Sequence, residues 1–289
     1  MVRLWRKLIL PLLNAANAKS ILEIGAESGD STRALLKYVS KKGGFLSCVD
    51  PAPIFDADEL QSNHLDTLKF YRDLSLNVLP KHEQFDVAMV DGDHNWYTVY
   101  NELQLIEKIH GHDPLAQPIV FVHDIGWPYG RRDLYYNPAT IPDEYRHPYE
   151  KNGILLGKSA LSDANGVNRN LCNATHEGGV RNGVLTATED FIAQSELDYK
   201  FINLPLYFGL GVLITQKKLK ANPALQSAVE RIESKAGLKE LVAFGEHLRC
   251  VDISFRQDVD RQLTLANARI AELELQIESR VANVLGDKL

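Results

Sequence analysis

The amino-acid sequence predicts an α/β fold in which a doubly wound, mostly parallel sheet carries helices on both faces. Short runs rich in β-branched and aromatic residues alternate with longer amphipathic segments, as expected for strands joined by crossover helices. Acidic residues and histidines follow several of these runs directly. Ligands of such sheets bind at the carboxyl ends of the strands, so the pattern predicts where the functional site lies.

The predicted strands begin close to the N-terminus and extend over the first two-thirds of the chain. They are residues 20–24, 45–49, 68–71, 85–90, 119–122, 199–203 and 208–215. The main helices predicted between them are residues 31–40 and 96–109, whose apolar residues recur at helical spacing. Both segments have a length that suits crossovers.

The composition is that of an ordinary globular protein. Of 289 residues, 45% are hydrophobic, which is enough for a sizeable core and excludes wholesale disorder. The 32 basic and 38 acidic residues give a net charge of -6, which argues against a nucleic-acid-binding protein. Cys48, Cys172 and Cys250 form no CxxC pair, so the cysteines indicate neither a disulfide framework nor a zinc site, and a cytoplasmic protein is expected.

Residues 1–19 are predicted to form an amphipathic helix. Its apolar residues recur at helical spacing: Leu4, Trp5, Leu8, Ile9, Leu12 and Leu13. We interpret it as a packing helix that covers one edge of the sheet. The alternative is a basic helix, carrying Arg3, Arg6 and Lys7, that rests on the inner face of a membrane.

The C-terminal part of the chain has a different pattern. Residues 219–255 are predicted as a helical connector and residues 256–289 as a coiled coil. Apolar residues there alternate at spacings of four and three, with Arg280 at one position of the seam: Val259, Leu263, Ala266, Ile270, Leu273, Ile277 and Val284. A coiled coil would make the protein a homo-oligomer or tether it to another enzyme. The alternative is a helix that folds back on the preceding domain.

The first motif that points to chemistry is the string LEIGAESGDST at residues 22–32. A strand ends in an acid, Glu23, and a turn with Gly25 and Gly29 lets the backbone approach a ligand closely. A helix then begins at Asp30 or Ser31, both of which are good N-cap residues. The glycine spacing differs from the G-x-G-x-x-G of dinucleotide-binding proteins, which disfavours a dehydrogenase.

Asp50 follows the next strand directly, 27 positions after Glu23. An acid at this place can bind the two hydroxyls of a ribose. The alternative is that Asp50 and the prolines after it form a plain turn.

Further polar residues follow the fourth and fifth strands. Asp91, Asp93 and His94 come after the fourth, and His123 and Asp124 come at the end of the fifth. These ends are adjacent in a parallel sheet, so the side chains can converge on one site. Carboxylates with an imidazole suit Mg, Ca or Mn, and a set richer in imidazole suits iron or zinc. Asp93 as a helix cap and His94 as a surface residue are the plain alternatives.

Residues 126–184 interrupt the alternation of strands and helices and are predicted as an insertion or lid that binds the acceptor. Its aromatic residues are interleaved with charged ones. The aromatic residues are Trp127, Tyr129, Tyr135, Tyr136, Tyr145 and Tyr149, and the charged ones include Arg131, Arg132 and Asp133. Trp127, Tyr129, Arg131, Arg132 and Tyr135 are the predicted acceptor-binding residues, because flat rings and bidentate donors suit a carbohydrate. The alternative is a loop that packs through its own aromatic side chains.

Taken in order, LEIGAESGDST, Asp50, VDGDH and VHDI resemble the motifs of class I S-adenosylmethionine-dependent methyltransferases. The DGDH and HD pair is similar to that of macrocin-type sugar O-methyltransferases and cephalosporin-hydroxylase-like proteins. The resemblance covers about residues 20–215. It implies a methyltransferase domain at residues 20–218 with a Rossmann-like seven-stranded sheet whose last strand is antiparallel.

The resemblance also implies roles for individual residues. The implied cofactor site consists of Glu23, Gly25, Ala26, Gly29, Ser31, Asp50 and Asp91, with Glu23 and Gly25 at the methionine part and Asp50 at the ribose. Asp91, His123 and Asp124 are the implied ligands of a divalent ion, Mg or Mn. Metal-dependent relatives commonly have two consecutive carboxyl or amide ligands after the fifth strand, where this chain has His123 and Asp124. His94 and His123 both remain candidates for the catalytic base.

These patterns predict an S-adenosylmethionine-dependent O-methyltransferase that acts, with a divalent metal, on a hydroxyl of a sugar or glycan. Two alternatives stay open. His94, His123 and a carboxylate would also form the facial triad of a non-haem iron oxygenase. Alternatively, the protein is a non-catalytic scaffold whose biological role is carried by the coiled coil.

Overall fold

The computed structural model describes residues 1–286, with side chains up to residue 278. The chain divides into a unit of residues Met1–Ile232 and a second unit that begins at Glu233. The first unit contains a seven-stranded sheet in the order β3-β2-β1-β4-β5-β10-β9. Its strands are β1 (Ser20–Ile24), β2 (Phe45–Val49), β3 (Leu68–Tyr71), β4 (Val87–Val90), β5 (Ile119–His123), β9 (Tyr199–Leu204) and β10 (Leu210–Thr215).

The sheet is mostly parallel, as predicted. The first five strands pair in parallel, whereas β10 pairs antiparallel with both β5 and β9. Every residue of β4 and β5 is buried, because helices cover both faces of the sheet at its centre. The carboxyl ends of β1, β2, β4 and β5 therefore meet at one edge, and the antiparallel β10 begins at this same edge with Leu210 opposite His123.

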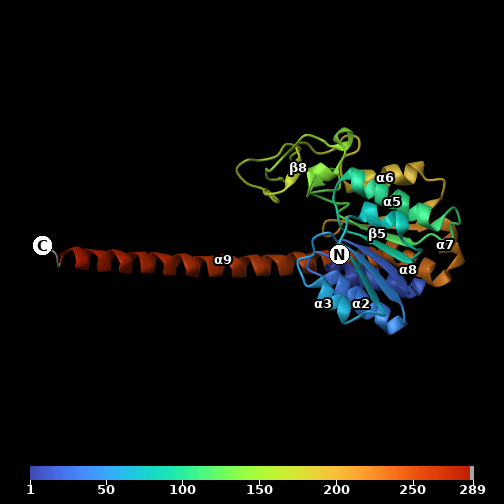
Figure 1. Cartoon of the computed structure of the whole chain (residues 1–289), viewed down its shortest axis with the longest axis horizontal. Coiled ribbons are helices and arrows are strands. Elements are labelled where there is room, and N and C mark those ends of the chain that lie inside the picture. The colour runs from blue at the N-terminus through green and yellow to red at the C-terminus, as the bar shows by residue number, and fades with distance from the viewer. Residues whose placement is uncertain (287–289) are drawn as a thin grey trace. The chain divides into compact units, whose positions relative to one another are not determined.

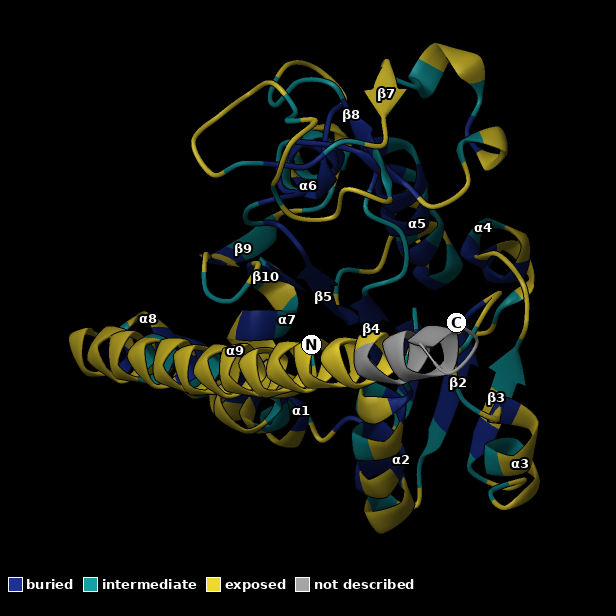
Figure 2. Cartoon of the chain, turned by 90° about the vertical axis from the view of Figure 1, so that its left-hand side faces the viewer, coloured by how far each residue is buried: buried dark blue, intermediate teal, exposed yellow. Residues whose placement is uncertain are grey.

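Helices flank the sheet on both faces, with α2 on one face and the packed pair α5 and α6 on the other (Figures 1 and 2). The α-helices between strands are α2 (Asp30–Lys42), α3 (Ala57–Ser62), α4 (Ser75–Val78), α5 (Trp96–His110) and α6 (Val184–Gln194). A 3-10 turn, η3 (Leu79–Lys81), follows α4, and α7 (Gln216–Ala221) and α8 (Pro223–Glu233) follow the last strand. The two predicted crossover helices correspond to α2 and α5.

The N-terminal segment is helical, but not uniformly α-helical. A 3-10 turn (η1, Val2–Leu4) and a π-helical stretch (η2, Trp5–Ile9) lead into α1 (Leu10–Ala16), which has Pro11 in its first turn. Five of the six residues of the apolar face are at most 1% exposed, Leu4, Leu8, Ile9, Leu12 and Leu13, and Trp5 is half-buried. This burial agrees with the packing interpretation and leaves these residues no apolar surface to offer to a membrane. Contact of the N-terminal segment with a membrane remains a prediction, and the burial of its apolar residues does not support it.

The insertion between β5 and α6 has a small sheet of its own, which the sequence pattern did not indicate. Its strands are β6 (Leu134–Tyr135), β7 (Tyr149–Glu150) and β8 (Cys172–Ala174), in the order β6-β8-β7. Two 3-10 turns, η4 (Pro138–Thr140) and η5 (Asp143–Tyr145), complete its regular structure. The buried carboxylate of Asp133 accepts hydrogen bonds from the backbone of Trp96 and Gly183, each at 2.7 Å, and thereby ties the insertion to the start of α5.

The second unit consists mainly of α9 (Lys235–Gly286), a helix of 52 residues. It continues through residues 255 and 256, where the sequence predicted a boundary between connector and coiled coil. Residues 287–289 of the predicted coiled coil, and the side chains of Arg280 and Val284, lie outside what the structure describes. Over the described part of the chain, no helix combines the length and the apolar character needed to cross a bilayer.

Gly25 lies where the loop after β1 meets the end of β4. Its φ is +89°, and a Cβ atom added there would lie 2.2 Å from the carbonyl oxygen of Asp91. The backbones on both sides are paired: the Gly25 N–H donates to the Val49 carbonyl, and the Asp91 N–H donates to the Ile24 carbonyl, each at 2.9 Å. A side chain at residue 25 would therefore push the loop away from two strands.

We predict that Gly25→Ala lowers the free energy of unfolding by roughly 3 kcal/mol or more, because it combines a backbone clash with an unfavourable φ. The matched control is Gly43→Ala. Gly43 also has a positive φ, +60°, but an added Cβ would meet no atom within 4 Å, so a cost of only about 1 kcal/mol is expected. Urea unfolding of both variants measures the difference, and equal losses would contradict the role given to the Gly25 contact.

Candidate functional site

A cavity of about 900 Å³ lies at the carboxyl edge of the sheet and receives residues from the ends of β1, β2, β4 and β5. Several residues of the predicted cofactor site line it: Gly25, Ala26, Ser31, Asp50 and Asp91. Residues of the insertion and of the turn before β10 line it as well. The predicted cofactor, metal and acceptor regions therefore border one continuous space.

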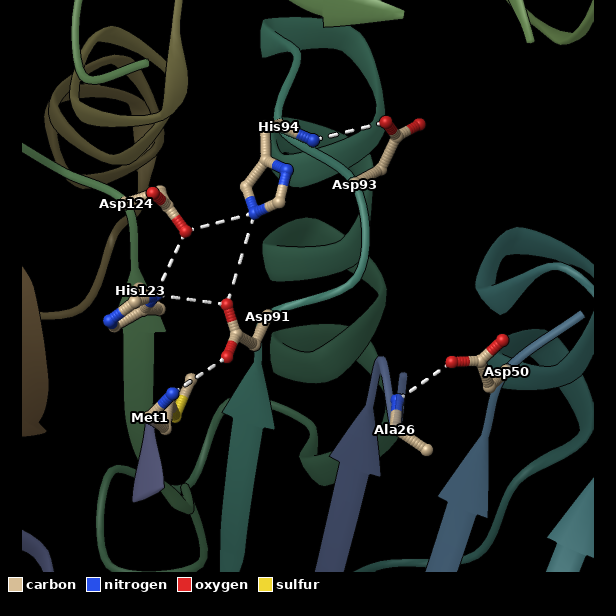
Figure 3. Close-up of polar contacts among 8 residues, drawn as sticks. All are labelled: Met1, Ala26, Asp50, Asp91, Asp93, His94, His123 and Asp124. Atoms are coloured by element: carbon tan, nitrogen blue, oxygen red, sulfur yellow. Dashed lines mark hydrogen bonds and ion pairs between the residues drawn. The ribbon is translucent and has the colours of Figure 1, made fainter. Parts of the chain in front are cut away.

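Asp50 organises the loop after β1. One of its carboxylate oxygens accepts a hydrogen bond from the backbone of Ala26 at 2.8 Å (Figure 3). The same oxygen accepts one from the backbone of Glu27 at 2.9 Å, and the other oxygen accepts one from Ala52 at 2.8 Å. Asp50 thus binds its own turn, as the plain alternative predicted, and also lines the cavity. Three of the roughly four lone-pair sites of the carboxylate are thus used, and Oδ1 can accept one further hydrogen bond, so both functions are compatible.

Glu23 lies beneath the loop and is only 1% exposed. The hydroxyl of Thr32 donates to Glu23 Oε2 at 2.6 Å, and the thiol of Cys48 donates to the same atom at 3.1 Å. Burial raises the pKa of Glu23 to about 7, although the hydrogen bonds from Thr32 and Cys48 oppose the shift. Glu23 is not among the residues that line the cavity, so its placement indicates support of the loop rather than direct contact with a ligand.

The helix α2 begins at one of the two predicted residues, but its N-cap residue differs from the expectation. Gly29, with a φ of +77°, is the N-cap residue, and Asp30 is the first residue of the helix. The aromatic ring of Phe55 and the side chain of Arg33 lie against Gly29. Gly29, predicted as a cofactor-binding residue, is likewise not among the residues lining the cavity.

Four side chains form a compact cluster, hereafter the acid–histidine cluster: Asp91, His94, His123 and Asp124 (Figure 3). His123 Nδ1 lies 3.0 Å from Asp91 Oδ1 and 2.8 Å from Asp124 Oδ2. His94 Nε2 lies 2.9 Å from the same oxygen of Asp124. Asp124 has a φ of +60°, a strained conformation for a residue with a side chain, and it contacts both histidines in this conformation.

The cluster is electrostatically coupled. Burial alone would lower the pKa of His123, but the negative charge of Asp91 and hydrogen bonds to Asp124 and Asp91 raise it to about 9. The pKa of His94 is raised well above its usual value, mainly by Asp124, against the effect of burial. In turn, burial would raise the pKa of Asp124, but His94 and His123 lower it to about 2. Without a bound cation, both histidines are therefore in the positively charged imidazolium form near neutral pH.

The α-amino group of Met1 also lies beside the cluster, 3.1 Å from Asp91 Oδ2. Asp91 lies between this positive charge and His123 (Figure 3). Burial would raise the pKa of Asp91, but these two charges and the hydrogen bonds from the histidines lower it well below its usual value. Asp91 is consequently an anion throughout the physiological pH range.

A metal ion could be held by Asp91, His123 and Asp124, whose ligand atoms all lie within 4.8 Å of one another. These are the three residues that the resemblance of the motifs implied as ligands. Two carboxylates with one imidazole suit a hard divalent cation such as Mn²⁺. Nδ1 of His123 is the ring nitrogen that faces both carboxylates, so it is the atom of this residue that could bind the metal.

Asp93 does not join the acid–histidine cluster, although the sequence placed it there as a candidate. Its carboxylate turns away from the other acids (Figure 3). One oxygen accepts a hydrogen bond from the His94 backbone at 3.0 Å, and the other accepts one from the Thr98 hydroxyl at 2.9 Å. Asn95, not Asp93, is the N-cap residue of α5. Asp93 instead fixes the backbone that carries His94.

Of the predicted acceptor-binding residues, the structure brings Tyr129 to the cavity. Its ring stacks on His94, with 5.6 Å between the ring centroids. Its hydroxyl accepts a hydrogen bond from Asn168 at 2.7 Å and donates one to Asn173 at 3.1 Å. Tyr129 therefore links the insertion directly to the acid–histidine cluster.

Four other predicted acceptor-binding residues do not line the cavity. Arg131 forms a bidentate ion pair with Glu189, and the fully buried Arg132 donates to the carbonyls of Ala174 and Ser159. The Tyr135 hydroxyl donates to Asp133 at 2.8 Å, and Trp127 packs beside the small cluster around Tyr129. These residues stabilise the insertion itself, which agrees with the alternative that the loop packs through its own side chains.

Several cavity residues were not predicted. Tyr136, noted earlier only as one of the aromatic residues, lines the cavity together with Asn137, Thr140 and Asn168. Tyr207 and Phe208 line it from the turn between β9 and β10, and both have positive φ, 53° and 68°. No polar motif marks this turn in the sequence. The antiparallel last strand was the available signal, because its first residues must lie at the carboxyl edge of the sheet.

Glu102 is a buried acid that reaches the cavity from α5. Its Oε1 forms a hydrogen bond of 2.5 Å with the hydroxyl of Ser75, and its Oε2 has no hydrogen-bond partner in the described structure. Burial raises the pKa of Glu102 from its usual 4.5 to about 8, with the Ser75 hydrogen bond opposing the shift. The side chain is consequently neutral at pH 7.

We predict that Glu102→Gln makes the stability of the protein less dependent on pH. Between about pH 4.5 and 8 the folded state keeps a proton on Glu102 that the unfolded state releases, so the free energy of unfolding falls as pH rises through this window. Gln mimics the neutral acid and should remove roughly 2 kcal/mol or more of that decline. Urea unfolding between pH 5 and 8.5 measures it.

The matched control for this experiment is Glu196→Gln, which changes an exposed carboxylate. It should leave the pH dependence as in the unaltered protein. If Glu102→Gln also leaves that dependence unchanged, Glu102 is ionised in the folded state and the assignment is wrong.

Comparison with known proteins places these observations in a family context. Residues 22–125 match the family model described as "Methyltransferase domain". No curated protein matches the chain. The match spans β1 to the end of β5 and therefore contains the loop after β1, Asp50 and the whole acid–histidine cluster.

Solved structures with a similar fold include several methyltransferases. The S-adenosylhomocysteine-bound methyltransferase PaMTH1 of Podospora anserina is 18% identical, with a TM-score of 0.44 over 72% of this chain and 76% of that one. A putative caffeoyl-CoA O-methyltransferase of Staphylococcus aureus is 16% identical, with a TM-score of 0.40 over 72% and 80% of the two chains. A putative O-methyltransferase of Nostoc punctiforme is 14% identical, with a TM-score of 0.44 over 74% and 55%. Residues 22–125 of this chain are therefore similar to a methyltransferase domain, in agreement with the motifs.

Proposed function

We propose that the protein transfers a methyl group from S-adenosylmethionine to a hydroxyl oxygen of a sugar or glycan, with the help of a divalent metal ion. The observation that carries the proposal is the meeting of three features at one cavity of about 900 Å³: the glycine loop after β1, Asp50 and the acid–histidine cluster. The methyltransferase domain match supports the same activity.

The cofactor would bind in the part of the cavity formed by the loop after β1 and the end of β2. Gly25 keeps this loop free of a side chain at its closest approach to β4. Asp50 holds the loop backbone through three hydrogen bonds, and its Oδ1 keeps one lone pair for a ribose hydroxyl. When bound, S-adenosylmethionine supplies a methyl group on a positively charged sulfur, and the chain must orient the acceptor oxygen in line with it.

The metal would bind Asp91, His123 and Asp124. Three side chains leave coordination positions open for an acceptor, as metal-dependent catalysis requires. A divalent ion supplies positive charge that lowers the pKa of a bound hydroxyl and offsets the carboxylates that keep the histidines protonated. The donor set of two carboxylates and one imidazole fits this role.

His94 is the better candidate for the base that accepts the hydroxyl proton. It lines the cavity but is not one of the three residues whose ligand atoms converge. Its Nδ1 is buried without a hydrogen-bond partner in the described structure, so the nitrogen is available to a substrate. Stacking on Tyr129 and the hydrogen bond from its backbone to Asp93 fix the orientation of the ring.

The acceptor would occupy the part of the cavity between the insertion and the turn before β10. Tyr129, Tyr136 and Tyr207 line it, together with Asn137 and Thr140. Flat aromatic surfaces with a few amide and hydroxyl groups suit the alternating apolar faces and hydroxyl edges of a sugar ring. A vicinal pair of hydroxyls could reach the metal and His94 together.

The iron-oxygenase alternative receives less support. A facial triad needs two histidines and one carboxylate, whereas the converging set contains one histidine and two carboxylates. The domain match also favours methyl transfer.

Asp50→Ala is predicted to weaken binding of S-adenosylhomocysteine at least about 100-fold, because it removes the hydroxyl acceptors and releases the loop N–H groups of Ala26 and Glu27. Isothermal titration calorimetry measures the affinity. Asp66→Ala, which removes an exposed acid after α3, is the matched control and should bind normally. Unchanged affinity of the Asp50 variant, in a protein that is folded by circular dichroism, would reject the ribose assignment.

Asp124→Asn is predicted to weaken Mn²⁺ binding by about tenfold or more, while affinity for S-adenosylhomocysteine changes little. Electron paramagnetic resonance of free Mn²⁺ measures the metal affinity directly. Asp93→Asn is the matched control, since its carboxylate faces Thr98 and the His94 backbone rather than the converging ligands. Equal Mn²⁺ affinity for the Asp124 variant and the unaltered protein would show that the metal, if used, binds elsewhere.

A further inference from the structure

The described part of α9 contains a long stretch of exposed residues. Every residue from 253 to 278 is exposed. Five large apolar residues of the heptad seam are between 41% and 61% exposed in the single chain: Val259, Leu263, Ile270, Leu273 and Ile277. Helices in proteins are stabilised mainly by packing of an apolar face, so this seam requires a partner.

We infer that the partner is a second copy of this chain, whose α9 packs against the first in parallel and in register to form a two-stranded coiled coil. This inference does not depend on the proposed methyl transfer. In the heptad, Leu263, Ile270 and Ile277 occupy the a positions, and Val259, Ala266 and Leu273 occupy the d positions. Ile270 and Ile277 at a, with Leu273 at d, follow the pattern that favours two strands over three or four.

The charges beside the seam select the parallel orientation. Arg269 directly precedes Ile270 and occupies a g position, whereas Glu274 directly follows Leu273 and occupies an e position. In a parallel pair in register, a g residue faces the e residue five positions further along the second copy. Arg269 of each copy then faces Glu274 of the other, which gives two attractive pairs by symmetry.

An antiparallel pair of the same segment would be unfavourable. With the seam residues fully overlapped, g residues face g residues and e residues face e residues. Arg269 would then face Arg269 of the second copy, and Asp260 would face Glu274. Each charged contact would be repulsive, so the charge pattern favours the parallel orientation over this one.

The first experiment measures the mass of the full chain by light scattering. The unaltered protein should have about twice the 32.4 kDa of one chain, and Ile270→Asp should reduce it to the mass of one chain. Leu275→Asp is the matched control: it places the same charge on an exposed apolar residue of the same helix, but away from the seam, and should keep the dimer. A monomeric unaltered protein, a trimer or tetramer, or equal effects of both variants would overturn the inference.

The second experiment tests the orientation. Arg269→Glu should weaken the dimer by roughly tenfold in dissociation constant, and the double variant Arg269→Glu with Glu274→Arg should restore it, because the exchanged charges attract again in the parallel pair. Analytical ultracentrifugation measures both, and circular dichroism checks that α9 remains helical. A dimer that the double variant does not restore would reject the parallel register.

A cysteine placed in the seam gives an independent readout of register. In a protein whose exposed Cys250 is replaced by serine, Ala266→Cys should form a disulfide between the two copies under mild oxidation, because residue 266 faces itself only in the parallel pair. Leu275→Cys is the control and should remain mostly uncrosslinked. Equal crosslinking of the two variants, or none at residue 266, would contradict the inference.

Discussion

The backbone contact between Gly25 and Asp91 is the constraint on which the site depends. The loop after β1 lies directly against the end of β4, at a distance that leaves no room for a side chain at residue 25. The same loop is bound on its other side by Asp50, at the end of β2. The ends of β1, β2 and β4 are thereby held together. The region expected to bind the cofactor consequently lies beside Asp91, which belongs to the acid–histidine cluster. A change that separates β1 from β4 would therefore alter both regions at once.

The acid–histidine cluster brings like charges close together in a largely buried place, and its stability depends on balanced charge. Asp91 and Asp124 are separated by the imidazole of His123, which lies within 3.0 Å of both. Unpaired carboxylates would be costly there, because desolvation favours the neutral acid. Protons on the histidines supply the compensating charge in the protein alone. A divalent ion could supply it instead, so the same geometry serves a metal-free and a metal-bound state, and the exchange of protons for a cation would make metal binding dependent on pH.

The sequence predicted the sheet well because its signals are local. Buried parallel strands are short apolar runs, and those ending at Ile24, Val49 and Val90 stand out between polar segments. The residues at the strand ends were found because topology fixes their position. Asp50, Asp91 and His123 lie at the carboxyl edge of the parallel sheet in every side-chain conformation. The insertion was not predictable in this way. Arg132 and Tyr135 have the composition of a binding surface, yet they turn inward to contacts with Ala174 and Asp133 that are distant in sequence. Glu102 was missed for a similar reason, since an acid on a crossover helix gives no sign that Ser75 lies beside it.

The most direct test of the central claim is a crystal structure of the protein with S-adenosylhomocysteine and Mn²⁺. We expect the ribose hydroxyls to lie within hydrogen-bond distance of Asp50, the sulfur to face the acid–histidine cluster, and the metal to bind Asp91, His123 and Asp124. S-adenosylhomocysteine bound outside the cavity at the carboxyl edge, or with its ribose away from Asp50, would contradict the proposed site. A metal bound without any of the three predicted ligands would contradict the proposed chemistry while leaving the cofactor site intact.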